Sequence, residues 1–318
     1  MNAAFLVTGG AGFIGSHLVE RLLRDYPSAT VRVLDDFSTG SMANLPFAAA
    51  AGAQLEVVRG DIRDLAAVER VAAGAGVVFH QAAMRSVPRS VADPLGANAS
   101  NVNGTLNVLE AARRHGVRRV VYASSSSVYG DRPDLPKQEE QPPAPISPYA
   151  VSKAAGEQYA AVWHRIYGVE TVGLRYFNVF GPRQDPASEY AAVIPRFILW
   201  GLRGEPLEVH GDGRQSRDFT YIDNVVEANC LAAGAQGASG VFNVGCGERV
   251  SLLQIIEKLE AVLGRPLERR HTPARAGDVA HTLADVGRAK RLLGYTPLVP
   301  FDEGFRRTVD HFGGGRSA

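Results

Sequence analysis

The stretch LVTGGAGFIGSHLVERLL, Leu6 to Leu23, joins a short apolar segment to an amphipathic one through a glycine-rich loop. Gly10, Gly12 and Gly15 have the G-x-G-x-x-G spacing, directly after a predicted strand and directly before a predicted helix. In such a loop Gly9 permits a tight turn, Gly12 lets the backbone approach a pyrophosphate, and Gly15 lets the helix pack closely on the strand. This context predicts a dinucleotide-binding unit.

An acidic residue stands where the ribose of a dinucleotide would lie. Asp35 follows Gly15 by twenty residues, at the end of the second predicted strand, and can accept hydrogen bonds from ribose hydroxyls. Its charge would repel a 2′-phosphate, and no arginine follows it directly, so we expect NAD rather than NADP. Asp61 in RGDIRD is expected near the adenine edge. The alternative is a structural turn with an exposed acid.

The rest of the chain alternates apolar β-branched segments with helical patterns, which is typical of a doubly wound parallel α/β sheet, the Rossmann arrangement. The predicted strands are 3–8, 30–34, 54–58, 76–80, 118–124 and 169–177, and the predicted helices are 16–26, 65–73, 101–116, 149–168 and 251–264. Loops rich in Gly, Asp and Arg follow Phe180. We therefore expect a dinucleotide-binding domain at 1–177 and a smaller mixed α/β substrate domain at 178–318, with a return of the chain to the first domain allowed.

The composition of the chain limits the kinds of partner that we expect it to bind. The 318 residues are 45% hydrophobic and 21% charged with a formal net charge of +1, which gives no electrostatic case for nucleic acid or an anionic membrane. The expected partner is a small molecule. Two cysteines, no run of 18 apolar residues and no basic leader before the first strand favour the cytoplasm. The histidines show no metal-ligand spacing, so no metal is expected.

The heptapeptide SPYAVSK, Ser147 to Lys153, contains the candidate general base. Tyr149 and Lys153 are four residues apart and share one helix face. A phenol has a pKa of about 10, and a nearby ammonium lowers that value by stabilising the phenolate. Ser147 is the expected N-cap and Pro148 the first helical residue. Taken alone, the pair is more typical of a solvated helix face.

Two further features favour the site. Four serines, Ser124 to Ser127, end a strand about 25 residues before Tyr149, and the carboxyl ends of strands in such a sheet present ligand-contacting groups. Arg217 and Arg275 lie in loops rich in glycine and aspartate, and their guanidinium groups suit a diphosphate.

With these residues in place, the chain resembles an extended short-chain dehydrogenase/reductase, and within that superfamily the NAD-dependent nucleotide-sugar 4-epimerases. The resemblance spans nearly the whole chain and is closest to bacterial UDP-N-acetylglucosamine and UDP-N-acetylglucosaminuronate 4-epimerases. The motifs that carry it are TGGAGFIGSHL, YASSSSVYG, SPYAVSK, LRYFNVFGPRQDP, AAVIPRF and GDGRQSRDFTYIDN.

The resemblance implies a redox cycle without net oxidation. Tyr149 would remove the O4 proton of a UDP-hexose while C4 gives a hydride to NAD, and the 4-keto sugar would turn and receive the hydride on its other face. Lys153 would bind the nicotinamide ribose, and Ser125 would hold O4, with an ambiguity of one residue among the serines. The other implied cofactor contacts are Gly9, Gly12, Phe13, Ile14, Gly15, Asp35, Asp36, Asp61, Ile62, Ala82 and Phe177. The implied substrate contacts are Arg85, Ser125, Ser126, Asn178, Gln184, Ala192, Val193, Arg217, Arg275, Asp278 and Thr282.

Related activities differ after the serine strand. Dehydratases of this superfamily carry an Asp-Glu pair, and decarboxylases a Glu, where this chain has Ser126 and Ser127, which favours simple epimerisation. In the family that the chain resembles, a large aromatic residue at the position of Thr282 disfavours a 2-acetamido group. Thr282 therefore favours an N-acetylated sugar over a plain hexose, and Ala192 and Gln184 point the same way. Arg85 has three open interpretations: it meets a cofactor phosphate, it meets the C6 carboxylate of a hexuronate, or it is turned to solvent.

Two expectations concern the protein as a whole. Helices 98–115 and 149–167 have apolar positions beyond one stripe and build the dimer interface in relatives, so a homodimer is expected. A non-catalytic NAD sensor is the alternative from another functional class, and it would have no need of Tyr149, Lys153 and Ser125 in register.

Overall fold

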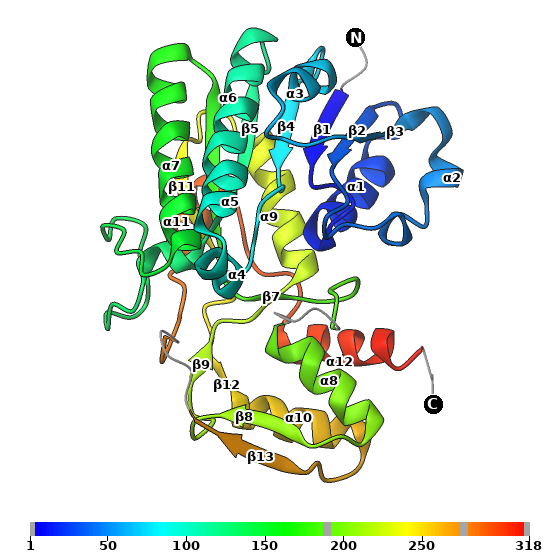
Figure 1. Cartoon of the computed structure of the whole chain (residues 1–318), viewed down its shortest axis with the longest axis vertical. Helices are drawn as coiled ribbons and strands as arrows, with labels where there is room; N and C mark the ends of the chain where they lie inside the picture. The colour runs from blue at the N-terminus through cyan, green and yellow to red at the C-terminus, as the bar shows by residue number, and fades with distance from the viewer. Residues whose placement is uncertain (1–3, 187–191, 274–278, 315–318) are drawn as a thin grey trace.

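The computed structural model describes residues 4–186, 192–273 and 279–314. A seven-stranded parallel sheet forms its larger lobe, with the carboxyl ends of the strands facing the smaller lobe (Figure 1). The strand order is β11 (Gly240–Val244), β6 (Glu170–Tyr176), β5 (Arg119–Ser125), β4 (Val77–His80), β1 (Ala4–Thr8), β2 (Thr30–Asp35) and β3 (Leu55–Arg59). The doubly wound α/β fold is thereby confirmed.

Helices cover both faces of the sheet, as the apolar strands require. In β1, Val7 packs into the core formed with α1 (Phe13–Asp25) and α9 (Ile222–Gly234), whereas Leu6 packs into the core under α3 (Leu65–Ala72) and α6 (Gly104–Arg114). The remaining elements of this lobe are η1 (Met42–Asn44), α2 (Ala48–Ala51), η2 (Gly52–Gln54), α4 (Val87–Ala92), α5 (Pro94–Asn98), η3 (Ala99–Asn103), η4 (Ser126–Tyr129) and α7 (Pro148–Tyr167).

The sheet takes one strand from the second half of the sequence. β11 pairs in parallel with β6, with Phe242 beside Leu174, and α9 packs against α1, β5 and β6. The chain therefore enters the smaller lobe after β6, comes back for α9 and β11, and leaves again. The sequence analysis missed β11.

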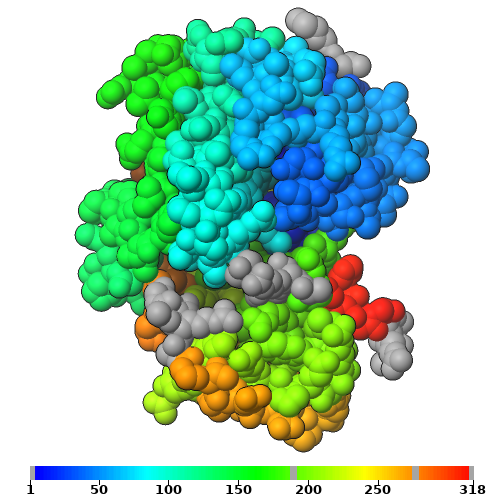
Figure 2. All heavy atoms as spheres, in the orientation of Figure 1, coloured from blue at the N-terminus to red at the C-terminus, as the bar shows by residue number. Residues whose placement is uncertain are grey.

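The smaller lobe is built from α8 (Val193–Arg203), α10 (Leu252–Leu263) and α12 (Phe301–Phe312) around short strand pairs. Figure 2 shows it beneath the sheet lobe. Phe180, Phe197, Tyr221, Ile255 and Phe305 join it to the same hydrophobic cluster as Val7, so the lobes share one core. The strand pairs are β7 (Val179–Phe180) with β10 (Thr220–Tyr221), β8 (Leu207–His210) with β13 (Arg269–Thr272), and β9 (Ser216–Arg217) with β12 (Val250–Ser251); α11 (Gly287–Leu293) lies near β11.

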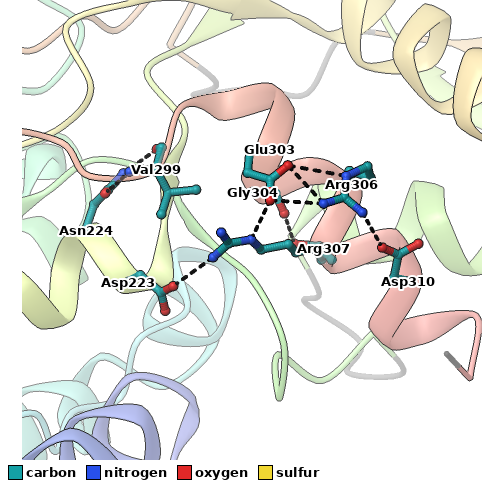
Figure 3. Close-up of polar contacts among 9 residues, drawn as sticks. Asp223, Asn224, Val299, Glu303, Gly304, Arg306, Arg307 and Asp310 are labelled. Carbon is teal, nitrogen blue, oxygen red and sulfur yellow. Dashed lines mark hydrogen bonds and ion pairs between the residues drawn. The ribbon is translucent and has the colours of Figure 1, made fainter. Parts of the chain in front are cut away.

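Polar contacts fix α12 against α9 (Figure 3). Asn224, fully buried in α9, accepts from the main-chain N–H groups of Leu298 and Val299 at 2.8 and 2.9 Å and donates to the Val299 carbonyl at 2.8 Å. At the surface, Arg307 bridges Glu303 and Asp223. Within the described ranges, no helix combines the length and the apolar character that a membrane crossing requires.

Candidate active site

The serines at the end of β5 point to different partners. Ser124 is buried and donates to Glu157 of α7 at 2.5 Å. Ser125 accepts from the N–H of Ser127 at 3.2 Å and from its hydroxyl at 2.9 Å, and its hydroxyl also acts on the nearby Tyr149 phenol, whose pKa it lowers. Because a hydroxyl has one proton and two acceptor positions, Ser125 is left to donate toward the phenol. Ser125 is thus the serine that meets Tyr149.

The first turn of α7 holds the phenol in place. The hydroxyl of Ser147 accepts from the Ala150 N–H at 3.2 Å, and Pro148 is the first helical residue, as predicted. The N–H of Tyr149 donates to the buried Ser90 hydroxyl at 3.1 Å, which gives this turn a second anchor. Tyr149 therefore sits at a well-defined helix start, with its side chain partly buried.

Lys153 lies one turn further along, behind the phenol. Its Nζ donates to the Ala123 carbonyl at 2.8 Å and lies 5.8 Å from the centroid of the Tyr149 ring. Burial lowers the pKa of Lys153 to about 7, and the charge of Glu157 opposes that shift. The ammonium is therefore close to the phenol and costly to keep charged.

Burial is also the largest influence on the phenol itself. It raises the pKa of Tyr149, while the hydrogen bond from Ser125 and the positive charge of Arg85 act in the opposite direction. The sequence had indicated Lys153 as the cation that tunes Tyr149. Arg85 is the cation whose charge lowers the pKa of Tyr149.

The loop that carries Arg85 is bonded to the same helix. Asn101 accepts from the Met84 N–H at 2.7 Å and donates to the Met84 carbonyl at 3.0 Å and to the Ser152 hydroxyl at 2.9 Å. Asn101 belongs to η3, a π-helical turn, a local deformation that often accompanies functional sites. The exposed Arg85 side chain therefore projects from a backbone fixed to α7.

The glycine loop has the geometry that its sequence predicts. Gly9 has a φ of 70°, and a Cβ on it would lie 2.7 Å from the Ala82 nitrogen. A Cβ on Gly15 would lie 2.1 Å from the Gly9 carbonyl oxygen. Gly12 is the N-cap of α1 and has no side chain that could cap the helix. The first N–H groups of α1, from Phe13 onward, therefore have no capping side chain. These groups suit a pyrophosphate.

Asp35 lies beside this loop. It is buried, and its carboxylate accepts from the N–H groups of Ala11 and Phe37, both at 2.9 Å. A carboxylate has about four acceptor positions, so two remain for ribose hydroxyls. Burial raises its pKa, and the two N–H groups oppose that shift. The donors and acceptors present fit a dinucleotide.

The other predicted cofactor residues have the following surroundings. Asp36 is exposed and accepts from Ser38, Asp61 accepts from Arg63, and Ile62 is buried below Gly104. Ala82 adjoins Gly9, and Phe177 is fully buried next to Tyr129.

A cavity of about 230 Å³ opens beyond the end of β6. Four predicted substrate residues line it, Asn178, Ala192, Val193 and Arg217, together with aromatic side chains that include Phe219 and Trp200. Arg217 also donates to the carbonyls of Ser216 and Ala280 at 3.0 and 2.9 Å.

The remaining substrate predictions have different outcomes. Thr282 accepts from the Asn178 side chain at 3.3 Å, and Gln184 is buried with its amide donating to the Val179 carbonyl. Ser126 begins the 3₁₀ turn η4. Arg275 and Asp278 lie outside the described residues.

Four buried polar residues that hold this site together were not predicted from the sequence: Ser90, Asn101, Glu157 and Asp218. Of these, Glu157 could have been suspected from the sequence, since it follows Lys153 by one turn of the predicted helix. Of the described part of the chain, no three His, Cys, Asp or Glu side chains are grouped to hold a metal ion.

The sequence matches a known protein family over most of its length. The model of the NAD dependent epimerase/dehydratase family matches residues 5–245. The chain belongs to this family. The predicted cofactor, NAD, and the resemblance to nucleotide-sugar epimerases are thereby confirmed.

Individual relatives match over almost their whole length. The UDP-glucose 4-epimerase of Mycolicibacterium smegmatis is 41% identical, over 96% of this chain and 97% of the relative. A structure of UDP-N-acetylglucosamine 4-epimerase from Methanobrevibacter ruminantium, in complex with UDP-N-acetylmuramic acid, has a TM-score of 0.92 at 39% identity, covering 98% of each chain. A UDP-glucose 4-epimerase from Thermus thermophilus, in complex with NAD, has a TM-score of 0.88 at 40% identity, covering 98% of this chain and 99% of the other.

Proposed function

We propose that this chain is an NAD-dependent 4-epimerase of UDP-hexoses, with UDP-N-acetylglucosamine and UDP-N-acetylgalactosamine as its preferred pair. The observation that carries the proposal is the meeting of the Tyr149 phenol with the Ser125 hydroxyl, beside the buried Lys153, at the carboxyl end of a central strand. In a doubly wound sheet, ligands bind at the carboxyl ends of the strands.

Each side chain has a distinct task. Tyr149 takes the proton from the sugar O4 and later returns it. Ser127 occupies the acceptor positions of Ser125. The one proton of Ser125 therefore points to the phenol in the free site and is donated to O4 when the sugar is bound. Lys153 stabilises the phenolate from one helical turn away. NAD bound beside these residues supplies a reversible hydride acceptor for C4, so the reaction needs no external oxidant.

Dehydration is disfavoured by the same region. It requires an acid and a base beyond the serine strand, where this chain has Ser126 and Ser127. Glu157 is a buried carboxylate behind this strand, but Arg175 binds it through two contacts of 2.8 Å and Ser124 donates to it as well. It is therefore engaged with other partners.

The UDP moiety is assigned to the cavity lined by Asn178, Val193 and Arg217. The N-terminus of α8 opens at this cavity without a side-chain cap, and Arg217 adds a positive charge, both of which suit a diphosphate. Binding energy from this non-reacting part leaves the sugar ring free to turn.

Small side chains favour the acetamido sugar. Ala192, which lines the cavity, and Thr282, which bonds the cavity residue Asn178, are small and leave room for a 2-acetamido group. A second candidate, a UDP-hexuronate, is favoured by one observation, the position of the exposed Arg85 close enough to lower the pKa of Tyr149. A cation there would lie on the sugar side of the site and suit a C6 carboxylate.

Product analysis tests the class and the substrate together. Purified protein is incubated with UDP-N-acetylglucosamine, UDP-glucose and their 6-carboxy forms, and the sugars are separated by anion-exchange chromatography. We expect 4-epimers, formed fastest from the acetamido sugar. If the hexuronates are preferred, Arg85→Gln should reduce their conversion far more than that of UDP-glucose. Absence of conversion of every UDP-sugar would reject the proposal.

A homodimer is the second part of the proposal. Apolar side chains of α4, α5 and α7 lie exposed on one side of the sheet lobe: Val91 at 62%, Leu95 at 82%, Val151 at 53% and Ile166 at 61%. Pro94, Ile146 and Val151 line a groove between α5 and the start of α7. Such a patch is typical of a subunit interface.

A further inference from the structure

We infer that Asp218 is a positioning residue that holds the walls of the UDP cavity in register. The inference rests on the proposed function, because it assigns the cavity to UDP. Asp218 itself does not line the cavity; it follows Arg217, which does.

The carboxylate of Asp218 binds two other segments. It is fully buried, with Oδ1 accepting from the Cys246 N–H at 2.8 Å and Oδ2 accepting from the N–H groups of Gly247 and Ala284 at 3.0 and 3.1 Å. Cys246 and Gly247 follow β11, whereas Ala284 comes two residues after Thr282. One side chain thus joins segments that are far apart in the sequence.

The main chain of Asp218 binds two of the predicted substrate residues. Its carbonyl accepts from the Asn178 amide at 3.3 Å, and its N–H donates to the Thr282 hydroxyl at 3.4 Å. Asn178 also donates to that hydroxyl. Asp218 therefore positions three predicted substrate residues. It bonds Asn178 and Thr282 directly, and Arg217 is its neighbour in the chain.

The fit around the carboxylate is close. A Cβ on Gly245 would lie 2.8 Å from Asp218 Oδ2 and 2.6 Å from the Ala284 Cβ. Burial raises the pKa of Asp218 to about 6, with the three N–H donors opposing the shift. Burying this carboxylate is costly, and its residue adjoins Arg217 and bonds Asn178, which both line the cavity. This combination fits a positioning role better than a role in the core alone.

Asp218→Asn tests this role. The amide has one acceptor oxygen in place of two and adds a donor facing main-chain N–H groups. We expect the dissociation constant of UDP, measured by titration calorimetry, to rise at least tenfold. With the preferred UDP-sugar, KM should rise similarly, while kcat at saturation and bound NAD per chain change less than threefold.

Arg119→Gln is the matched control. Arg119 is equally buried and donates to the carbonyls of Ala232 and Ala235. It lies at the amino end of β5, whereas the candidate site lies at the carboxyl ends of the strands. Its loss should lower the melting temperature and leave UDP affinity within twofold of the wild type.

Gly245→Ala is the second variant, for the case that Asp218→Asn does not fold. Its added methyl group crowds the Asp218 carboxylate and should also weaken UDP binding. UDP affinity within twofold of the wild type in a folded Asp218→Asn, or in Gly245→Ala if only that one folds, would overturn the inference. Failure of the wild type to bind UDP would instead reject the proposed function.

Discussion

The hydroxyl of Ser124 and the carboxylate of Glu157 lie 2.5 Å apart and join the end of β5 to the middle of α7. Arg175 on β6 binds the same carboxylate through two N–H groups, and its guanidinium lies 4.7 Å from the centroid of the Tyr129 ring. The strand that ends in Ser125 and the helix that begins with Pro148 are therefore held together behind the candidate site.

Glu157→Gln should destabilise the protein because it leaves the buried Arg175 without its counterion. We expect a loss of about 3–5 kcal/mol in the free energy of unfolding, measured by urea titration. Glu303→Gln is the control, since its ion pairs with Arg306 and Arg307 lie at the surface (Figure 3) and should contribute far less than the buried pair. Equal effects of the two substitutions would contradict this account of the buried pair.

Tyr149→Phe should remove the proton acceptor and keep the ring. Loss of a general base lowers kcat about 10²–10⁴-fold, whereas UDP affinity and bound NAD should stay close to the wild-type values. Tyr167→Phe, at the exposed end of the same helix, should retain full activity. Retention of most of the activity in Tyr149→Phe would remove Tyr149 from its role.

Arg85→Gln should shift the pH dependence of kcat/KM. The charge of Arg85 lowers the pKa of Tyr149, so its removal raises that pKa, and the base form becomes available only at higher pH. The rising limb of the profile with UDP-glucose should therefore move to higher pH, while Arg85→Lys keeps it near the wild-type position. An unchanged profile in Arg85→Gln would show that this charge does not act on the phenol.

His80 should make the fold sensitive to acid. It is fully buried between the hydroxyls of Thr8 and Thr105, and burial lowers its pKa from 6.5 to about 3. The folded state thus favours the neutral ring, so the contribution is complete above pH 6.5 and is lost as the pH falls toward 3. The wild type should lose about 1.4 kcal/mol per pH unit more than His80→Gln in this interval, measured by urea unfolding. Parallel curves for the two proteins would contradict the prediction.

Leu95→Glu should convert the proposed homodimer to a monomer, because a charge would enter the apolar patch of α4, α5 and α7. Light scattering after gel filtration gives the mass directly. Leu298→Glu is the control, at a comparably exposed leucine in the loop before α12. A monomeric wild type would reject the dimer.

Much of the fold could be predicted because its signals are local. The glycine loop, the apolar strands and the N-cap at Ser147 each depend on neighbours within a few residues, and all are present in the structure. The short strand at 240–244 could not be assigned from its own sequence, because its pairing with β6 depends on a chain return across some sixty residues of sequence.

The site was predictable only in part, because several of its contacts join residues that are far apart in the sequence. Tyr149 and Lys153 stand out by their spacing, and the serines stand out because they end a strand of a parallel sheet, where ligand-contacting groups are expected. Asp218 gives no such signal, since its three N–H donors come from residues 28, 29 and 66 positions away. Side-chain direction alternates along a strand, and Ser124 turns to Glu157, which favours Ser125 among the serines.

The return of the chain through α9 and β11 limits how the two lobes can be separated or exchanged. A fragment ending after β6 would expose the unpaired edge of that strand and the apolar surface that α9 covers, and such edges promote aggregation. A chimera that joins this sheet to the substrate lobe of another family member with a single crossover would carry a foreign edge strand. Grafting therefore needs several junctions, which keep residues 222–244 with the sheet on which they pack.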